Sequence, residues 1–281
     1  MKNQKELSLK EESEISQPLF SIVTVSYNSE KTIERTIKSI LSQTESDYEY
    51  WIIDGCSSDG TMDIVKRYQP LFKGKLFSIS EPDLGIYNAM NKGIEVVSGK
   101  IIGIVNSDDW LEEDALENIR FTMENVENPY DSIYCGWVYF HYNDGGIGLM
   151  KTDKKRVDKY HKKFKMGVRH PATFVSATVY KQVGVFDESY AIKADHDFIF
   201  RCMNENVNFY FIDKVLTNMS DGGVSNNKQY KKKRYEDLRY FYSKYTISYF
   251  KYHMFLFRDM LAIYIKGVIP QRLLEIIRHI R

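Results

Sequence analysis

Short apolar runs alternate with amphipathic helical patterns along the first 140 residues, and this alternation restricts the folds open to the 281-residue chain more than any other feature. The apolar runs predict strands at residues 20–25, 50–53, 76–79, 101–105, 133–139 and 209–212. Between them, apolar residues recur at helical spacing, as in Ile33, Ile37 and Ile40. Strands that alternate with helices form βαβ units, so the sequence predicts an α/β fold with a mixed, mainly parallel sheet and helices on both faces.

Charge is unevenly distributed, although the formal net charge is only +1. Residues 1–150 carry 13 basic and 25 acidic side chains, whereas residues 228–281 carry 13 basic and 4 acidic ones. An acidic half suits a site that uses a metal ion, and a basic tail suits an anionic surface. Cys56, Cys135 and Cys202 are scattered without a CxxC pair, so neither a disulfide framework nor a zinc site is indicated and a reducing, cytoplasmic compartment is expected.

An uncharged run from Ile101 to Val105 leads into two adjacent carboxylates, Asp108 and Asp109. The run predicts a strand buried on both faces, and ligands bind at the carboxyl ends of strands in open α/β sheets. Two adjacent carboxylates repel one another unless a cation lies between them and a ligand. A hard divalent cation shared with phosphate oxygens would account for the pair. The alternative is a solvated turn that caps the next helix.

Polar residues also follow other predicted strands, with Tyr27 and Asn28 after the first and Asp54 after the second. We expect these residues and the Asp108-Asp109 pair to converge, because the carboxyl ends of parallel strands meet at one edge of a sheet. The chain lacks both GxGxxG and GxxxxGK[ST], which excludes the dinucleotide fingerprint and the P-loop NTPases. A nucleotide could still bind through a base-reading carboxylate and a metal that holds its diphosphate.

Five segments of the chain resemble the family 2 glycosyltransferases, which are nucleotide-sugar-dependent, inverting enzymes of the GT-A fold. These segments are, in the family's order, Ser21–Asn28, Asp54–Thr61, Glu81–Gly93, Asn106–Trp110 and Gly184–Asp197. The resemblance implies a Rossmann-like GT-A catalytic domain at residues 18–227. Its nucleotide-binding half would span residues 18–140 and its acceptor half residues 141–227, followed by a C-terminal helical extension.

The resemblance also implies roles for individual residues. Asp195 occupies the place of the general base and Asp109 that of the ligand to Mn²⁺ or Mg²⁺. Asp54 would accept a hydrogen bond from a uracil-like base, and Asp108 would contact the ribose or the donor sugar. The other residues that would surround the nucleotide sugar are Val25, Tyr27, Asn28, Asp83, Asn88 and Lys92.

Two departures from the family's pattern affect what the resemblance implies. Many members carry two consecutive Asp residues where this chain has Asp54 and Gly55, so the base that is read stays open. The downstream QxxRW motif of the processive synthases is absent, which favours addition of a single sugar.

Simpler explanations exist for four residues in the acceptor half. Asp195 could cap the helix that the sequence predicts from residue 194 onward. His170, which precedes Pro171, is either a buried structural histidine or a contact to the metal or the diphosphate. Asp197 and Arg201 have the spacing of an i,i+4 surface ion pair on the same helix.

The segments outside the regular pattern carry further expectations. Residues 1–17 are polar and predict a disordered lead-in, not a signal peptide, and residues 141–165 predict a mobile, Lys-rich loop. Residues 228–281 predict a basic, aromatic helical tail that either packs on protein, including a second copy in a homodimer, or lies on an anionic membrane. The chain has no long apolar run and no recognisable nucleic-acid module, so we expect no bilayer span and no nucleic acid partner.

We therefore expect a glycosyltransferase that moves one sugar from a nucleoside-diphosphate sugar, in particular a UDP-sugar, to a hydroxyl of a glycan or lipid-linked acceptor. Its place would be the cytoplasm, including the inner face of the plasma membrane. One rival is a sugar nucleotidyltransferase, but the Gly-rich basic loop that such enzymes usually carry after the first strand is missing from residues 27–30. The other rival is a catalytically silent nucleotide-sugar-binding protein, against which the presence of Asp109 and Asp195 argues.

Overall fold

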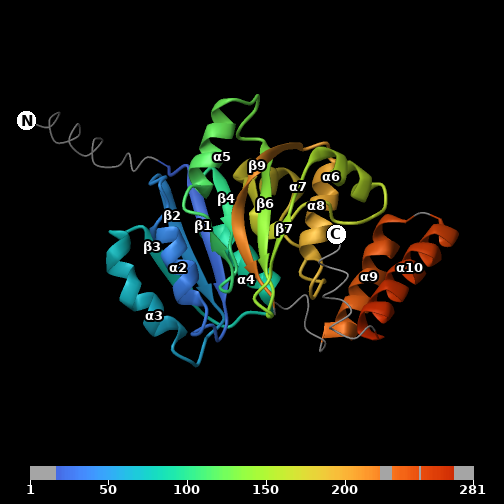
Figure 1. Ribbon diagram of the computed structural model, residues 1–281, viewed down its shortest axis with the longest axis horizontal. Helices are drawn as coiled ribbons and strands as arrows, with labels where there is room; N and C mark the ends of the chain where they lie inside the picture. Colours follow the sequence, from blue (N-terminus) through green and yellow to red (C-terminus); the bar gives the residue numbers. More distant parts are fainter. Residues whose placement is uncertain (1–16, 222–229, 247, 269–281) are drawn as a thin grey trace, which may run out of the picture. The chain divides into compact units, whose positions relative to one another are not determined.

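The computed structural model describes residues 17–221, 230–246 and 248–268 (Figure 1). The predicted lead-in lies outside the described residues except for Gln17, and so does the end of the tail beyond residue 268. The chain divides into two compact units. The larger unit spans Met1–Glu188 and Ala194–Gly223, and the smaller one Ser189–Lys193 and Val224–Arg281.

The first half of the larger unit is built on parallel strands. These are β1 (Phe20–Ser26), β2 (Tyr48–Asp54), β3 (Leu76–Ser80) and β4 (Ile101–Ile104). They pair in the order β3-β2-β1-β4 (Figure 1). Every residue of β4 is buried, as expected for a strand that is covered on both faces. The parallel pairing brings the carboxyl ends of β1, β2 and β3 to one edge.

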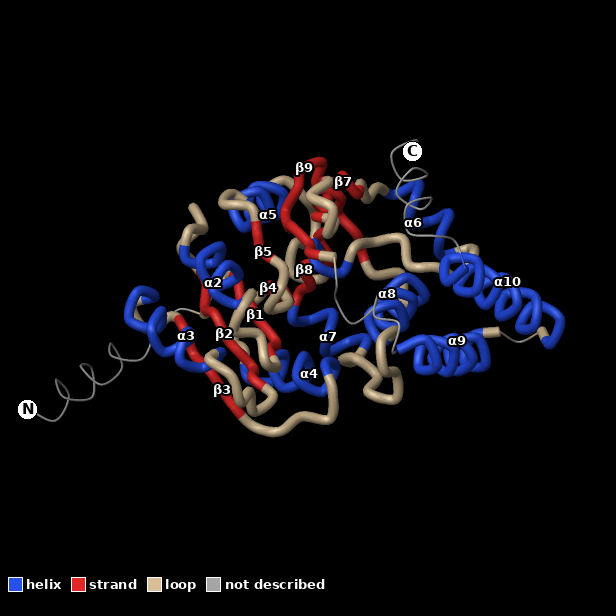
Figure 2. Tube along the Cα trace, turned by 60° about the horizontal axis from the view of Figure 1, so that its bottom comes forward, coloured by secondary structure: helices blue, strands red, loops and turns tan. Residues whose placement is uncertain are grey.

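Helices connect these strands and cover both faces of the sheet. They are α2 (Ile33–Leu41), α3 (Thr61–Tyr68), continued by a 3₁₀ turn at Gln69–Phe72, and α4 (Ile86–Val96). The apolar side of α2 shares a core with Phe20 and Ile22, whereas Gly93 of α4 lies against Val23. Because successive residues of a strand point to opposite faces, α2 and α4 cover opposite sides of β1 (Figure 2). The predicted helices on both faces are confirmed.

The sheet continues with strands of mixed direction. They are β5 (Trp110–Leu111), β6 (Ser132–His141), β7 (Ile147–Met150), β8 (Thr173–Ser176) and β9 (Asn208–Ser220). β8 is antiparallel to β4 and β6, whereas β6 and β9 are parallel. The helices of this half are α5 (Ala115–Glu124), α6 (Lys154–His161), α7 (Ala177–Val183) and α8 (Ala194–Asn204). The α/β class and the mixed sheet are therefore as predicted.

The mobile loop predicted at residues 141–165 is wrong for much of its length, because it contains β7 and α6. The turn between Tyr142 and Gly146 folds β7 back onto β6. Asp153 then caps α6 by accepting a hydrogen bond from the Arg156 backbone N–H at 2.7 Å. Val157 of α6 is 2% exposed, so one apolar side chain anchors an otherwise charged helix.

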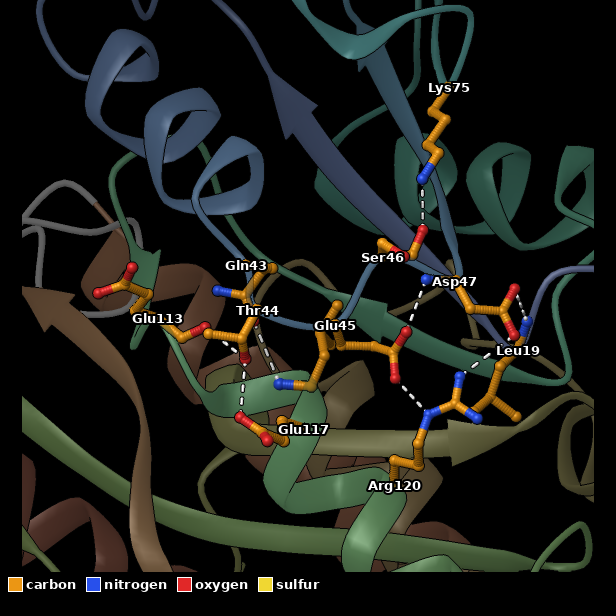
Figure 3. Close-up of polar contacts among 11 residues, drawn as sticks. Leu19, Gln43, Thr44, Glu45, Ser46, Asp47, Lys75, Glu113, Glu117 and Arg120 are labelled. Carbon is orange, nitrogen blue, oxygen red and sulfur yellow. Dashed lines mark hydrogen bonds and ion pairs between the residues drawn. The ribbon is translucent and has the colours of Figure 1, made fainter.

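A polar network fastens the turn before β2 to α5, as Figure 3 shows. The Arg120 guanidinium of α5 pairs with Glu45 and with Asp47, the latter at 3.2 Å. Asp47 also accepts a hydrogen bond from the backbone N–H of Leu19, just before β1. These contacts lie at the amino ends of β1 and β2. They therefore brace the sheet at the edge opposite to the one that carries Asp54.

The smaller unit contains α9 (Lys231–Tyr245) and α10 (Tyr249–Val268). The Asp237 carboxylate of α9 accepts hydrogen bonds from the backbone N–H groups of Ala191 at 3.0 Å and Ile192 at 2.8 Å. The Tyr242 hydroxyl joins α9 to α10 by donating to Asp259 at 2.6 Å. None of the helices in the described part of the chain has the length and hydropathy needed to cross a membrane.

Candidate active site

Asp54 lies at the end of β2, where strand register surrounds it with hydroxyl groups. Ser26 of β1 and Ser80 of β3 are its partners in register on either side, and both donate hydrogen bonds to its carboxylate, at 3.0 and 2.7 Å. Ser57 donates twice more, through its backbone N–H and its hydroxyl. Each oxygen of this fully buried carboxylate thus has two donors, so Asp54 holds the loop that follows it.

The loop after β1 is tied to the loop after β2. Asn28 has a left-handed backbone, with φ of 49°, and its N–H donates to the Ser57 hydroxyl at 2.8 Å. Its side-chain oxygen accepts from the Ser58 N–H at 2.9 Å. Tyr27 next to it is 65% exposed, whereas Val25 is buried within β1. The predicted nucleotide residues Tyr27 and Asn28 therefore lie beside the Asp54 loop, with Tyr27 presenting an uncovered ring.

The segment between β3 and α4 forms a braced turn that carries Asp83. Its Oδ1 accepts a hydrogen bond from the Gly85 N–H at 2.9 Å, and Gly85 has a φ of 129° that favours glycine. Asn88 accepts from the Leu84 N–H at 3.2 Å. Lys92 donates to the Pro82 carbonyl at 2.8 Å and pairs with Glu81 at 2.6 Å. In the structure, Asn88 and Lys92 thus support the turn that positions Asp83.

The Asp108-Asp109 pair follows β4, and the structure separates its two members by exposure. Asp109 is 1% exposed, and its oxygens accept hydrogen bonds from the Asn106 side-chain amide at 3.1 Å and the Ser220 backbone N–H at 3.2 Å. Asp108 is half-buried. Asp109 does not cap the following helix, because β5 intervenes and α5 begins at Ala115. The alternative that the pair is a helix cap is therefore excluded.

Burial has the largest effect on the pKa of both carboxylates. Loss of solvation and the neighbouring charge of Asp108 raise the pKa of Asp109 to about 7. Desolvation also raises the pKa of Asp108, and the positive charge of Arg35 opposes that shift. A divalent cation would favour the ionised form of both groups.

The residues around the pair fit a hard divalent cation. The side-chain oxygen of Asn106 is buried and accepts no hydrogen bond from the described residues, and it belongs to the residue whose amide nitrogen contacts Asp109. Carboxylate and amide oxygens are the donors that Mg²⁺ and Mn²⁺ prefer. The described residues hold no cluster of three or more His, Cys, Asp or Glu side chains able to bind a metal. Oxygens of a bound ligand or water would have to complete the coordination.

The loop after Asp54 and the Asp108-Asp109 pair meet at one edge of the sheet. Asn28 contacts the Asp54 loop, and its neighbour Ser29 shares a hydrogen bond of 2.8 Å with Ser107, next to Asp108. Arg35 of α2 was not singled out by the sequence, yet its guanidinium donates to the Asp108 carbonyl and to the Ser220 hydroxyl, both at 2.8 Å. Arg35 also stacks on the ring of Trp110, 3.6 Å from its centroid. The sequence predicts only that this helix covers the sheet, so nothing in it indicates that Arg35 contacts the site.

Asp195 lies in the first turn of α8 and accepts a hydrogen bond from the Tyr87 hydroxyl of α4 at 3.2 Å. Its Oδ1 also accepts from the N–H of the adjacent His196. Desolvation lowers the pKa of His170, and the nearby charge of Asp195 opposes this shift. His170 packs edge-on against Phe186 at 5.7 Å and forms no metal-binding trio with the acidic pair among the described residues. The sequence did not single out Tyr87, although it lies within the Glu81–Gly93 segment that resembles the family.

The pair of Asp197 and Arg201 is not on the surface, contrary to expectation. Asp197 is fully buried, and Arg201 donates to it at 2.9 Å. Arg201 also donates to the carbonyls of Val183, Gly184 and Val185. The pair therefore fixes α8 against the end of α7, and Asp195 lies two residues before Asp197 in the same first turn.

Comparison with known proteins gives the family. Residues 21–188 match the model of glycosyl transferase family 2. An uncharacterized glycosyltransferase of Methanocaldococcus jannaschii is 32% identical over 209 residues, covering 72% of this chain and 71% of the relative. A PGL/p-HBAD biosynthesis glycosyltransferase of Mycobacterium bovis is 29% identical over 212 residues, covering 74% and 80%.

Solved structures share the fold. S. aureus TarS 1–349 in complex with UDP-GlcNAc matches with a TM-score of 0.65 at 17% identity, over 88% of this chain and 72% of that one. The match spans 42% of a longer TarS chain. A mannosyltransferase of Pyrobaculum calidifontis in complex with GDP-Man and Mn²⁺ matches with a TM-score of 0.58 at 14% identity, over 88% and 70%. With its α/β sheet, its acidic edge and these relatives, the chain belongs to glycosyl transferase family 2 and is a glycosyltransferase of the GT-A fold.

Proposed function

We propose that the protein transfers one sugar from a UDP-sugar to a hydroxyl of a glycan or lipid-linked acceptor, with inversion at the anomeric carbon. The observation that carries this proposal is the gathering of the Tyr27, Asp54, Asp83 and Asp108-Asp109 segments at the carboxyl edge of the parallel strands. A neighbour in fold binds UDP-GlcNAc, and a relative acts in PGL/p-HBAD biosynthesis. We propose cell-envelope glycan assembly as the setting.

Asp108 and Asp109 would hold Mn²⁺ or Mg²⁺, with Asn106 beside them. When bound, the cation neutralises the charge that develops on the departing diphosphate. Asp108 is the more accessible of the two carboxylates, whereas Asp109 is enclosed by Asn106 and Ser220. We therefore expect Asp108 to contact solvent and ligand, and Asp109 to contact the cation from its buried side. His170 stays a proposed contact to metal or diphosphate.

Asp195 would act as the general base. In a single displacement, the acceptor oxygen forms a bond to the anomeric carbon while the bond from that carbon to the phosphate oxygen breaks. The acceptor hydroxyl gives its proton to the Asp195 carboxylate, and the nucleoside diphosphate departs with the electron pair. The hydrogen bond from Tyr87 fixes one oxygen of Asp195, which orients the carboxylate for this transfer.

The decisive experiment separates donor binding from transfer. Asp195→Asn should bind UDP-GlcNAc or another UDP-hexose with unchanged affinity in calorimetry, because the donor does not need the base. Its rate of UDP release with a panel of polyprenyl-linked and soluble glycans should fall roughly 10²–10⁴-fold. Asp213→Asn, at an exposed position of β9, is the matched control and should transfer at the parent rate. Transfer by Asp195→Asn at the parent rate would contradict the assignment.

We also propose that the smaller unit contacts a membrane surface that carries lipid-linked acceptors. α10 exposes large apolar side chains spaced alternately by four and three residues, namely Phe250, Met254, Phe257, Leu261 and Tyr264. Such a stripe on a helix of a basic segment suits the boundary of an anionic bilayer. A homodimer formed through the same stripe is the competing arrangement.

A further inference from the structure

Gly55 lets the turn before α4 lie directly on the end of β2. A Cβ atom at this position would be 3.3 Å from the Asp83 Cγ and closer still to its Oδ2. The same atom would be 3.4 Å from the Tyr27 ring. Real Cβ atoms do not tolerate such an approach to a held group, so any side chain at residue 55 would displace Asp83. The glycine that departs from the family's paired acids therefore makes room for another carboxylate.

The two carboxylates at this place differ in their free acceptor capacity. Both Asp54 oxygens have two donors each, so Asp54 can accept from a ligand only by losing a serine or backbone partner. Asp83 uses Oδ1 for the Gly85 N–H, and within the described residues no hydrogen bond reaches its Oδ2. This oxygen and the exposed ring of Tyr27 both lie against Gly55. An aromatic surface and a negative acceptor are thus presented together.

We infer that Asp83, seated on Gly55, reads the nucleotide base in place of the second acid, and that it selects uracil or thymine. The inference rests on the proposed function and identifies its base-specificity residue. A base that stacks on Tyr27 would donate its N–H to Asp83 Oδ2. Asp54 then shapes the loop without contacting the base.

The selectivity follows from the different surroundings of the two Asp83 oxygens, because Oδ1 already accepts from the Gly85 N–H whereas Oδ2 accepts no hydrogen bond from the described residues. Uracil and thymine present one imide N–H, which one carboxylate oxygen satisfies. Guanine presents two adjacent N–H donors, which suit a carboxylate with both oxygens available. Cytosine presents an unprotonated ring nitrogen that a carboxylate repels. The brace from Asn88 and Lys92 keeps the Asp83 turn from rotating to serve the other bases.

Calorimetry with the full-length protein and Mn²⁺ tests the base preference with UDP, dTDP, CDP and GDP. The parent should bind UDP and dTDP at least tenfold more tightly than CDP and GDP. Asp83→Asn should bind UDP roughly tenfold or more weakly, because a charge-assisted hydrogen bond is lost. The same variant should bind CDP more tightly, because its amide N–H can donate to the cytosine ring nitrogen. Asp63→Asn, the same change at an exposed position of α3, should leave all four affinities unchanged.

Gly55→Ala tests whether the space left by the missing side chain of Gly55 is needed to place Asp83. The added methyl should displace Asp83 and lower UDP affinity without lowering CDP affinity. Gly55→Ala combined with Asp83→Ala should bind UDP no more weakly than Asp83→Ala alone, because both changes remove one interaction. Thermal unfolding of each variant checks that the fold persists.

The outcomes separate this inference from the proposed function. If UDP binds with Mn²⁺ but Asp83→Asn leaves the ratio of UDP to CDP affinity unchanged, the inference is wrong and the function stands. A parent that prefers GDP to UDP would also overturn it. If none of the four nucleotides binds with Mn²⁺, both the function and the inference fail.

Discussion

Asp109 is 1% exposed and lies beside a second carboxylate, and these two surroundings raise its pKa to about 7. In an unfolded chain the pKa of aspartate is about 3.9. Between these values the folded protein binds more protons than the unfolded chain. Without a metal, the free energy of unfolding must therefore fall as pH rises through this window.

We predict that the metal-free protein loses about 2 kcal/mol of stability from this group between pH 5 and pH 7. Asp109→Asn cannot ionise, so it should lack this part of the pH dependence. Urea unfolding of both proteins at the two pH values, in the presence of a chelator, measures the difference. Mn²⁺ should restore stability at pH 7 to the parent more than to the variant. Parallel pH profiles for parent and variant would show that Asp109 is ionised without penalty.

For single residues, the sequence identified the carboxylates of the site but not the groups that surround them. Asp108 and Asp109 were found because an apolar run ends on them, and Asp54 because it follows the next strand of the sheet. Ser26 and Ser80, which donate to Asp54, are 28 and 26 residues away from it, and Ser220 is 111 residues from Asp109. Such contacts leave no local pattern in the chain.

The helix α8 is held by an ion pair that spacing alone assigned to the surface. Asp197 is fully buried, and Arg201 is its i,i+4 partner as well as a donor to three carbonyls after α7. Removal of one partner of a buried pair leaves an uncompensated charge and unsatisfied acceptors. The Arg201 guanidinium therefore fastens the helix that carries Asp195 to the end of α7.

We predict that Arg201→Ala lowers the free energy of unfolding by about 3 kcal/mol. Lys154→Ala breaks the exposed i,i+4 pair with Asp158 on α6 and serves as the control, which should change little. Urea unfolding measures both variants. Equal, small effects would mean that the buried pair is not needed to hold α8.

Elements with a clear period were predicted well, and those without one were not. β1, β4 and α2 carry unbroken apolar patterns, and their observed bounds lie close to the expected ones. β7 and α6 were predicted as a loop because residues 141–165 as a whole are polar and rich in Lys. A hairpin turn pairs β7 with β6, a cap begins α6 and Val157 is buried, and of these the burial is visible only in the folded chain.

The whole chain consists of two units with different surfaces. The larger unit holds the acidic edge, whereas the smaller one belongs to the basic end of the chain and exposes the apolar stripe of α10. A segment of only five residues, Ser189–Lys193, joins the smaller unit through Asp237. No sequence pattern indicates that those residues belong to a different unit from their neighbours.

We predict that the protein floats with vesicles that contain phosphatidylglycerol and that the combined change Phe250→Ser, Phe257→Ser and Leu261→Ser lowers partitioning roughly tenfold or more. Phe121→Ser, at a 68% exposed position of α5, is the matched control and should float like the parent. Absence of the parent from the vesicle fraction would refute membrane contact. A dimer that dissociates on the triple change, seen by sedimentation without vesicles, would assign the stripe to a second copy.

The sequence by itself determined the α/β class, the edge at which the acids gather and the family resemblance, because hydrophobic periods and strand ends are local properties of the chain. Only the tertiary structure decided which carboxylates keep a free oxygen. In the sequence, Asp54 and Asp83 look alike, because both are acids that follow a strand. In the fold, strand register places hydroxyl donors on both oxygens of Asp54. The missing side chain of Gly55 leaves room for Asp83, whose Oδ2 stays open to a ligand. Burial and hydrogen-bond saturation arise from contacts between distant segments, so they become defined only when the chain is folded.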